Sequence, residues 1–306
     1  MASNLKTTEL DFDDIKRNLK NFLKRQTVFN DYDFEGAGLN VLLDVLAYNT
    51  HYNAMAGHLA LNEAFLDSAQ IRGNAVSRAR MLGYVPASQL AAKATVNLVV
   101  NVAGVAGTKP TNLSLPRGTK LSTTVDGESF QFVTLNTQSA TIVGNTYTYN
   151  NVEIAEGDYN SIKYRVDNDI ENQKHQIPHK LVDTSTLRVR VQANEESTSF
   201  DIFTLFTTLL NVDASSKIYH LQENTSGFYE VYFGDGVTGS KPLNNNIVTL
   251  DYVHSNGPDA NGANVFAMVD DIGGFSNITI TTVKTAAGGA AGETLESIRY
   301  NAPLTY

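Results

Sequence analysis

The segment Thr95-Val-Asn-Leu-Val-Val-Asn-Val102 marks a change in the spacing of apolar residues along the chain. From Ala94 onward they alternate with polar residues, which is the period-2 pattern of a half-buried strand. Before that point, residues 11 to about 82 carry them at spacings of three and four, as amphipathic helices do. The sequence therefore predicts an α+β protein, in which an N-terminal helical segment of about three helices precedes antiparallel β-rich domains.

The first predicted helix runs from Asp11 to Arg25, and Asp11 is a residue type that caps helix N-termini well. Its large apolar side chains form one stripe: Phe12, Ile15, Leu19, Phe22 and Leu23. An isolated helix of about 15 residues is marginal in water, so another surface must cover this stripe. The cover is either the chain's own long helix or another subunit, and we expect a partner-binding stripe.

A second helix is predicted from about Leu39 to Leu66, and a third from Asp67 through Leu82. About 28 residues would make a rod of roughly 40 Å at 1.5 Å per residue. The long helix carries apolar residues on more than one side, which indicates partners beyond its own hairpin. We expect this segment to dock into an assembly; the alternative is an ordinary helical domain whose core is complete.

Short alternating strands separated by turn residues fill most of the chain after Ala94. Asp126-Gly127 between two of them is a strong hairpin signal. Leu187–Val191 is another strand, with Arg188 and Arg190 expected on its solvent side. The predicted domains are a helical assembly segment at 1–92, antiparallel β-rich domains at 93–180 and 181–290, and the start of a truncated C-terminal region at 291–306.

The composition suits a folded chain and excludes several kinds of chemistry. Of the 306 residues, 42% are hydrophobic and 18% are charged, which favours packed cores over disorder. The formal net charge of -9 disfavours binding to phosphates or to a membrane surface, so neither nucleic acid nor a membrane is expected as a partner. The absence of cysteine excludes thiol nucleophiles and Cys-ligated metals. No apolar run approaches the roughly 20 residues of a membrane-spanning helix.

The segment Gly234-Asp-Gly-Val-Thr-Gly239 matches the G-x-G-x-x-G pattern and follows a predicted strand. A dinucleotide site also needs a helix directly afterwards, whose N-terminus holds the pyrophosphate. Here Ser240 to Asn246 contains a proline and three asparagines, and another strand follows. The segment is therefore predicted to be the end of a β-hairpin, shaped by Gly234, Asp235, Gly236 and Gly239.

Other candidate chemistry is weaker still. His175 and His179 have the spacing of metal ligands on a helix, but Pro178 lies between them and disfavours a helix. Asp167-Asn-Asp169 lacks the glycine and the glutamate of a calcium loop and is predicted to be a turn. No nucleophile, base and oxyanion site can be assembled from the sequence. We therefore predict no catalytic, cofactor-binding or metal-binding residues, no small-molecule substrate and no enzyme activity.

Several longer stretches are distinctive as a set. They are Phe29–Asp44, Ala47–Asn53, Asn62–Ser68, Leu82–Pro86, Val182–Val191, Leu221–Asn224, Tyr229–Gly239, Gly288–Gly289 and Glu293–Pro303. Together they resemble the large baseplate wedge subunit of T-even-like contractile-tailed phages, a family related to baseplate J proteins. The resemblance spans most of the chain and is loosest over about 95 to 180.

This resemblance implies a structural role. Members of the family join other wedge subunits, partly through a helical core bundle, and link neighbouring wedges into the inner baseplate ring. The expected partners are other baseplate wedge proteins and further copies of the chain, in a virion tail baseplate assembled in the host cytoplasm. A β-rich adhesin or carbohydrate-binding tail module is the alternative. In the family a further region follows the element at Glu293–Pro303, so we expect the chain to be the N-terminal part of a longer protein.

Overall fold

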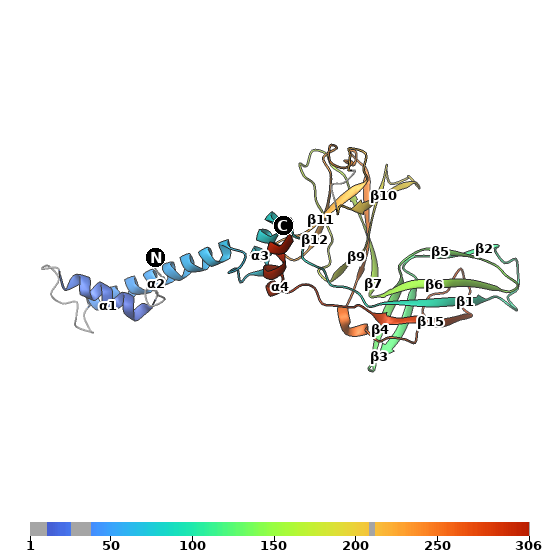
Figure 1. Ribbon diagram of the computed structural model, residues 1–306, viewed down its shortest axis with the longest axis horizontal. Coiled ribbons are helices and arrows are strands. Elements are labelled where there is room, and N and C mark those ends of the chain that lie inside the picture. The colour runs from blue at the N-terminus through green and yellow to red at the C-terminus, as the bar shows by residue number, and fades with distance from the viewer. Residues whose placement is uncertain (1–10, 26–37, 208–211, 306) are drawn as a thin grey trace. The chain divides into compact units, whose positions relative to one another are not determined.

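The computed structural model describes residues 11–25, 38–207 and 212–305. The chain divides into two compact units, Met1–Arg78 and Ala79–Tyr306. Helices make up the described part of the first unit, and β-sheets dominate the second (Figure 1). Helices followed by mostly antiparallel sheets confirm the predicted α+β class.

The elements carry the labels of Figure 1. The helices are α1 (Phe12–Leu23), α2 (Gly38–Ala64), α3 (Arg72–Met81) and α4 (Leu295–Asn301), with 3-10 helices η2 (Gly257–Ala260) and η3 (Ala302–Thr305). The strands are β1 (Lys93–Asn101), β2 (Asn112–Leu115), β3 (Lys120–Val125), β4 (Glu128–Thr134), β5 (Gln138–Thr141), β6 (Thr146–Glu156), β7 (Asp158–Arg165), β8 (His175–Gln176), β9 (Val182–Gln192), β10 (Phe200–Leu205), β11 (Ile218–Glu223), β12 (Tyr229–Phe233), β13 (Ile247–His254), β14 (Ala267–Met268) and β15 (Ile278–Ala287).

A carboxylate near the end of α2 fixes the start of α3. Glu63 accepts the backbone N–H of Gln70 at 2.8 Å and that of Ile71 at 3.3 Å. The chain folds back onto this side chain, which satisfies N–H groups that the first turn of a helix leaves free. The third helix therefore begins at Arg72, and not at Asp67 as the sequence predicts.

The first sheet has the strand order β14-β3-β4-β6-β1-β15. Burial alternates residue by residue along β1, as the period-2 pattern predicts. Val96, Leu98 and Val100 point into a core that also contains Phe132 and Ile154. The β2–β5 ribbon contributes to the same core, so the sheet has one packed face.

The second sheet has the order β7-β13-β9-β10-β11-β12-β8. Seven consecutive residues of β13 are buried, since this strand lies between β7 and β9 within the sheet. The pair β10 and β11 is parallel, with Thr204 opposite Ile218, and departs from the antiparallel pairing predicted throughout.

Arg190 of β9 binds a buried carboxylate, whereas the sequence predicts that its side chain faces solvent. Its Nε and Nη2 donate to the carboxylate of Asp251 at 2.8 and 3.0 Å. Ser161 Oγ donates to the same carboxylate at 2.7 Å. Asp251 lies on β13, directly beside β9, and a buried charge needs such a partner.

The hairpin predicted at Asp126-Gly127 is confirmed. These two residues join β3 to β4 and have φ values of 51° and 89°. Val125 pairs with Glu128 across them. Two consecutive residues with positive φ are typical of the tight turns that match the twist of a hairpin.

The second sheet is inserted into the first along the chain. After β6 the chain crosses at Gly157, builds β7 to β13, and returns through η2 to β14 and β15 of the first sheet. The residues that form each sheet therefore differ from the predicted β-rich domains at 93–180 and 181–290, because β14 and β15 return to the first sheet. The reason is that apolar periodicity identifies a strand but does not identify the strand with which it pairs.

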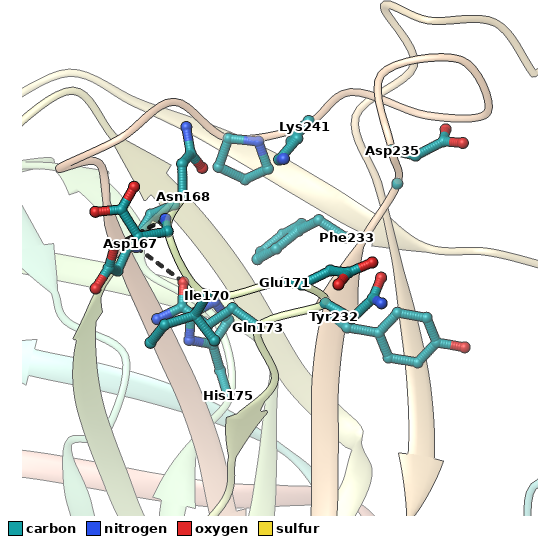
Figure 2. Close-up of a pocket in the computed structure, with 15 residues that line it drawn as sticks. Asp167, Asn168, Ile170, Glu171, Gln173, His175, Tyr232, Phe233, Asp235 and Lys241 are labelled. Atoms are coloured by element: carbon teal, nitrogen blue, oxygen red, sulfur yellow. Dashed lines mark hydrogen bonds between the residues drawn. The ribbon is translucent and has the colours of Figure 1, made fainter.

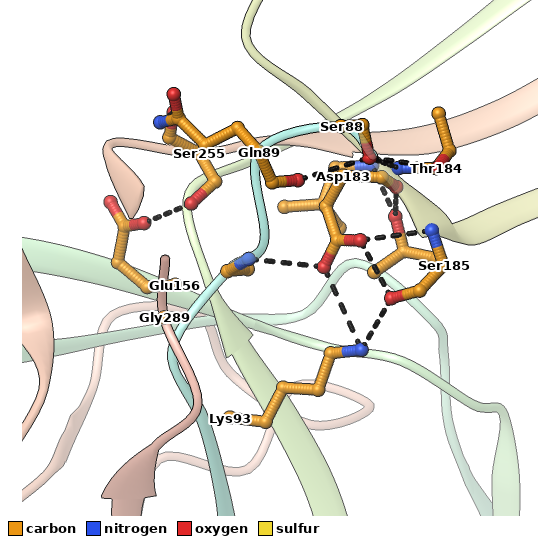
Figure 3. Close-up of polar contacts among 12 residues, drawn as sticks. Ser88, Gln89, Lys93, Glu156, Asp183, Thr184, Ser185, Ser255 and Gly289 are labelled. Carbon is orange, nitrogen blue, oxygen red and sulfur yellow. Dashed lines mark hydrogen bonds and ion pairs between the residues drawn. The ribbon is translucent and has the colours of Figure 1, made fainter. Parts of the chain in front are cut away.

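A buried carboxylate, Asp183, stands at the junction between the two sheets (Figure 3). It accepts the N–H of Ala91 at 3.1 Å and the N–H and hydroxyl of Ser185 at 2.9 and 2.6 Å. Lys93 Nζ lies 3.6 Å from the same carboxylate. Ala91 and Lys93 lead into the first sheet, whereas Asp183 begins the second, so these contacts join the two.

A second buried carboxylate, Glu156, holds the return of the chain. It accepts the hydroxyl of Ser255 at 2.7 Å and both the backbone and side-chain N–H groups of Asn256 at 3.0 and 2.8 Å. Gln89 donates to the carbonyl of Ser255 at 2.7 Å. The exit from β13 is thereby fixed to the end of β6.

We predict that Gly157→Ala destabilises the second unit more than Gly127→Ala does. Both glycines have positive φ, which alone costs an alanine roughly 1–2 kcal/mol. A Cβ at Gly157 would also lie 2.1 Å from the carbonyl oxygen of His254, whereas a Cβ at Gly127 has no neighbour within 4 Å. Denaturant unfolding of the two variants measures the difference. Equal losses of stability would contradict the close approach at the crossing.

Candidate assembly interface

Helix α1 packs along α2 in the first unit. Asp11 caps α1, as the sequence predicts, by accepting a backbone N–H at 2.8 Å. Lys16 Nζ lies 2.5 Å from a carboxylate oxygen of Asp44, and the rings of Phe12 and Tyr48 meet edge to face at 6.5 Å. One ion pair and one aromatic contact thus fix the register of the two helices.

The predicted partner-binding stripe on α1 is divided between two environments. Ile15 is buried, and Phe12, Leu19 and Leu23 are half-buried. Phe22 leaves 62% of its surface exposed. The packing of α1 on α2 therefore covers part of the stripe, and Phe22 is the member that remains open to another molecule.

Helix α2 carries a longer exposed stripe, which we call the α2 seam. Its members are Val41, Val45, Tyr48, Tyr52, Met55 and Leu59. Each is between 48% and 60% exposed. They are separated alternately by four and three residues, which is the alternation that apolar residues show along the seam of a coiled coil.

A different side of α2 is covered by the chain itself near the start of the helix. Asn40, Leu43 and Ala47 are buried there, away from the α2 seam. The prediction was limited to apolar residues on more than one side of this helix, although the alternation of four and three is present in the sequence alone. No helix in the described part of the chain is long and apolar enough to cross a membrane.

The segment after α3 is bound to α4 through one carboxylate. Glu293 accepts the hydroxyl of Tyr84 at 2.7 Å, the N–H of Ala87 at 3.0 Å, the amide of Asn301 at 2.9 Å and the hydroxyl of Ser297 at 2.8 Å. Four donors from two distant parts of the sequence thus converge on a single side chain, which we call the Glu293 clasp.

The Glu293 clasp joins two of the stretches that carry the family resemblance, Leu82–Pro86 and Glu293–Pro303. Burial by itself would raise the pKa of Glu293, but the hydrogen bonds it accepts bring that pKa below its ordinary value. Burial, followed by the contact with Glu293, raises the pKa of Tyr84 to about 12. At pH 7 the carboxylate is charged and the phenol is neutral, which is the pairing that the hydrogen bonds require.

The glycine segment between β12 and β13 is a closed loop, and the prediction of a hairpin there is wrong. Asp235 accepts two following backbone N–H groups at 2.9 Å, and Gly236 and Gly239 have φ values of 90° and 89°. A Cβ at Gly234 would lie 2.2 Å from a carbonyl oxygen of the loop. However, β12 pairs with β11 and β8, whereas β13 pairs with β7 and β9. The loop carries the chain across the sheet between strands that are not neighbours.

A pocket of about 270 Å³ lies beside this loop (Figure 2). Asp167, Glu171, Asp235 and Lys241 line it together with His175. Burial lowers the pKa of His175 to about 4, so its ring is neutral at pH 7. The described residues that line the pocket include no serine, threonine or cysteine that this ring could activate.

The two histidines at metal-ligand spacing belong to different environments. His179 Nδ1 lies 2.7 Å from the hydroxyl of Tyr252, and its ring stacks on His254 with centroids 5.0 Å apart. His175 instead packs against Phe233, with ring centroids 5.8 Å apart. Among residues 11–25, 38–207 and 212–305, no group of three or more His, Asp or Glu side chains could hold a metal ion.

Comparison with known proteins finds relatives of the helical segment and of the longer chain. Residues 11–84 match the family model of the helical domain of gp6-like baseplate wedge proteins. The matched residues contain α1, α2 and α3, and therefore the whole α2 seam. Residues 11–84 are thus similar to this helical domain.

A related similarity extends over nearly the whole chain. The chain is 30% identical to the baseplate wedge protein gp6 of Enterobacteria phage T4 over 316 residues, which cover 94% of the chain and 46% of that relative. The chain thus spans about half the length of the curated relative it matches. A chain from the cryo-EM structure of the anti-feeding prophage baseplate, 6-fold symmetrised, aligns with a TM-score of 0.28 and 12% identity, covering 95% of this chain and 50% of that one. A TM-score of this size does not establish a shared fold.

The gp6-like relationship confirms the resemblance to phage baseplate wedge proteins that the sequence predicts. The T4 relative is named as a baseplate wedge protein, and this does not favour the adhesin or carbohydrate-binding alternative.

We predict that Glu293→Gln lowers the stability of the second unit at pH 7 by on the order of 1–3 kcal/mol, because hydrogen bonds to a charged acceptor are lost. A carboxylate with a lowered pKa stabilises the fold above its unfolded pKa, and this contribution disappears as the pH falls through the folded pKa. The difference between variant and wild type should therefore shrink in acid.

Thermal unfolding from pH 7 downward measures this effect. Glu296→Gln is the matched control, because Glu296 lies three residues away in the first turn of α4 and is exposed. A constant difference at all pH values would show that the charge of Glu293 does not matter.

Proposed function

We propose that this chain is a structural subunit of a contractile phage tail baseplate, which joins wedge proteins and links wedges into the inner baseplate ring. Its partners are other baseplate wedge proteins and further copies of itself, in a virion assembled in the host cytoplasm. The relationship to gp6-like wedge proteins supports this role, and the α2 seam is the observation that carries it.

The α2 seam is suited to burial by other helices. Six large apolar side chains stand in a row on a helix of 27 residues, which is about 40 Å long. Full burial contributes on the order of 1.5–3 kcal/mol for each side chain. Alternating spacings of four and three residues allow the row to stay in contact with partner helices that wind around it. The seam therefore favours a helical bundle over contact with a flat surface.

Tyrosines at the centre of the seam favour a specific contact. The hydroxyls of Tyr48 and Tyr52 lie 2.9 Å apart, and their ring centroids are 4.6 Å apart. A tyrosine combines a large apolar ring with a polar tip, which suits an interface that excludes water from its centre and meets water at its rim. Phe22 of α1 adds a further exposed aromatic ring in the same unit.

We predict that Tyr52→Glu with Met55→Glu prevents this chain from co-purifying with other wedge proteins of its phage. Both side chains are more than half exposed, so the charges should leave the helical circular dichroism of the isolated chain unchanged. Asn53→Glu is the matched control, since Asn53 is exposed on the same turn but outside the seam. Normal co-purification of the double variant would contradict the proposed interface.

A second pair of variants separates the packing of α1 from docking. Ile15 is 8% exposed, and Phe22 is 62% exposed. Ile15→Asp should therefore unfold α1 from α2, at a cost of about 2–5 kcal/mol. Phe22→Asp should keep the melting behaviour of the isolated chain and weaken its assembly. Unfolding by Phe22→Asp would show instead that this ring belongs to the core of the first unit.

A further inference from the structure

A cleft between the two sheets of the second unit concentrates positive charge. It has a volume of about 600 Å³ and is lined by residues of β1, β6, β9 and β15. Its cationic side chains are Lys93, Arg117, Arg188 and Lys284, and the carboxylate in its lining is Glu153. The whole chain has a formal net charge of -9, so the cleft differs in sign from the protein as a whole.

Two of these cations also serve the fold. Lys93 Nζ lies 2.6 Å from the hydroxyl of Ser185, next to the junction at Asp183 (Figure 3). Arg117 Nη2 donates to the carbonyl of Thr186 at 2.6 Å. Arg117 Nε is buried and has no acceptor among the described residues. A buried donor without an acceptor is costly, and an acceptor supplied by another molecule would remove that cost.

The other two cations have no carboxylate partner in the described part of the chain. Arg188 lies over the ring of Phe200, 5.6 Å from its centroid. Lys284 is exposed on β15, the edge strand of the first sheet. Burial is the main cause that lowers the pKa of Arg117; Tyr159 and Asp251 raise this pKa, and the charges of Arg188 and Arg190 lower it. Arg117 and Arg188 therefore lie close enough for their charges to repel each other.

We propose that this cleft binds an acidic peptide segment of a partner protein. Carboxylates of the segment would meet Arg117, Arg188 and Lys284, and a guanidinium can hold a carboxylate through two parallel hydrogen bonds. The volume of the cleft falls within the roughly 300–1,000 Å³ of typical ligand pockets. This site lies in the second unit and does not depend on the α2 seam, so either proposal can fail without the other.

An acidic peptide fits this cleft better than a nucleic acid does. A nucleic-acid backbone carries closely spaced charges, and these would meet Glu153 as well as the negative charge of the whole chain. The described residues that line the cleft include no aromatic ring on which a base could stack. A peptide can place two or three carboxylates opposite the cations and leave neutral groups opposite Glu153.

Fluorescence polarisation with a labelled ten-residue peptide of alternating Asp, Glu and Gly tests the proposal on the full chain. The expected result at about 0.05 M salt, where screening is weak, is binding that is lost when Asn and Gln replace the acids. Arg188→Glu with Lys284→Glu should weaken binding at least about tenfold. Lys163→Glu with Lys174→Glu is the matched control, because it changes the net charge equally at exposed positions outside the cleft.

Three results would overturn the proposal. They are equal binding of the neutral peptide, equal weakening by the control variant, and preference for a labelled oligothymidine over the acidic peptide. Binding of inorganic phosphate without any binding of the peptide would also reject a peptide site. If the double variant fails to fold, Lys284→Glu alone decides the matter, since this exposed side chain has no described partner whose loss could unfold the sheet.

Discussion

Two buried carboxylates at the crossing between the sheets hold the second unit together. The apolar cores of the two sheets form separate clusters, so a shared hydrophobic interior does not join them. Asp183 and Glu156 instead collect N–H and hydroxyl donors from segments that belong to both sheets. A buried carboxylate that lost its donors would cost several kcal/mol. Hydrogen bonds to these carboxylates need particular donors in particular directions, so they specify the crossing more closely than apolar packing alone does.

The two units offer other molecules surfaces of different physical character. The α2 seam is apolar, so its contribution to binding depends on the area that a partner covers and little on salt. The cleft around Arg188 is charged, so it acts over a longer distance and is weakened by screening. For a partner that contacted both surfaces, the charged cleft would speed association and the α2 seam would contribute most of the binding energy. Neither surface requires the other to be occupied, because each lies within one compact unit.

Local features of the sequence predicted the fold better than distant ones. The hairpin at Asp126-Gly127 could be read directly, because its turn and its paired strands are consecutive. The segment Gly234–Gly239 carries the same turn signals, but β12 finds its partners elsewhere, and the hairpin inferred from it does not exist. The Glu293 clasp could not be predicted from the sequence, because Tyr84 and Glu293 lie 209 residues apart. The α2 seam was within reach, because its spacing is visible along one helix.

The insertion of the second sheet has a consequence for how such chains can diversify. Its first strand and its last strand pair with each other, with Asp158 opposite His254, so the segment enters and leaves at one place. An inserted segment with adjacent ends can be exchanged, enlarged or shortened while the host sheet keeps its closure. Evolution can therefore treat residues 158–254 as a replaceable cassette, provided that the replacement brings its own counterpart of Asp183; Glu156 and its donors Ser255 and Asn256 lie outside the cassette. Related chains with this architecture can keep the first sheet constant and vary the second.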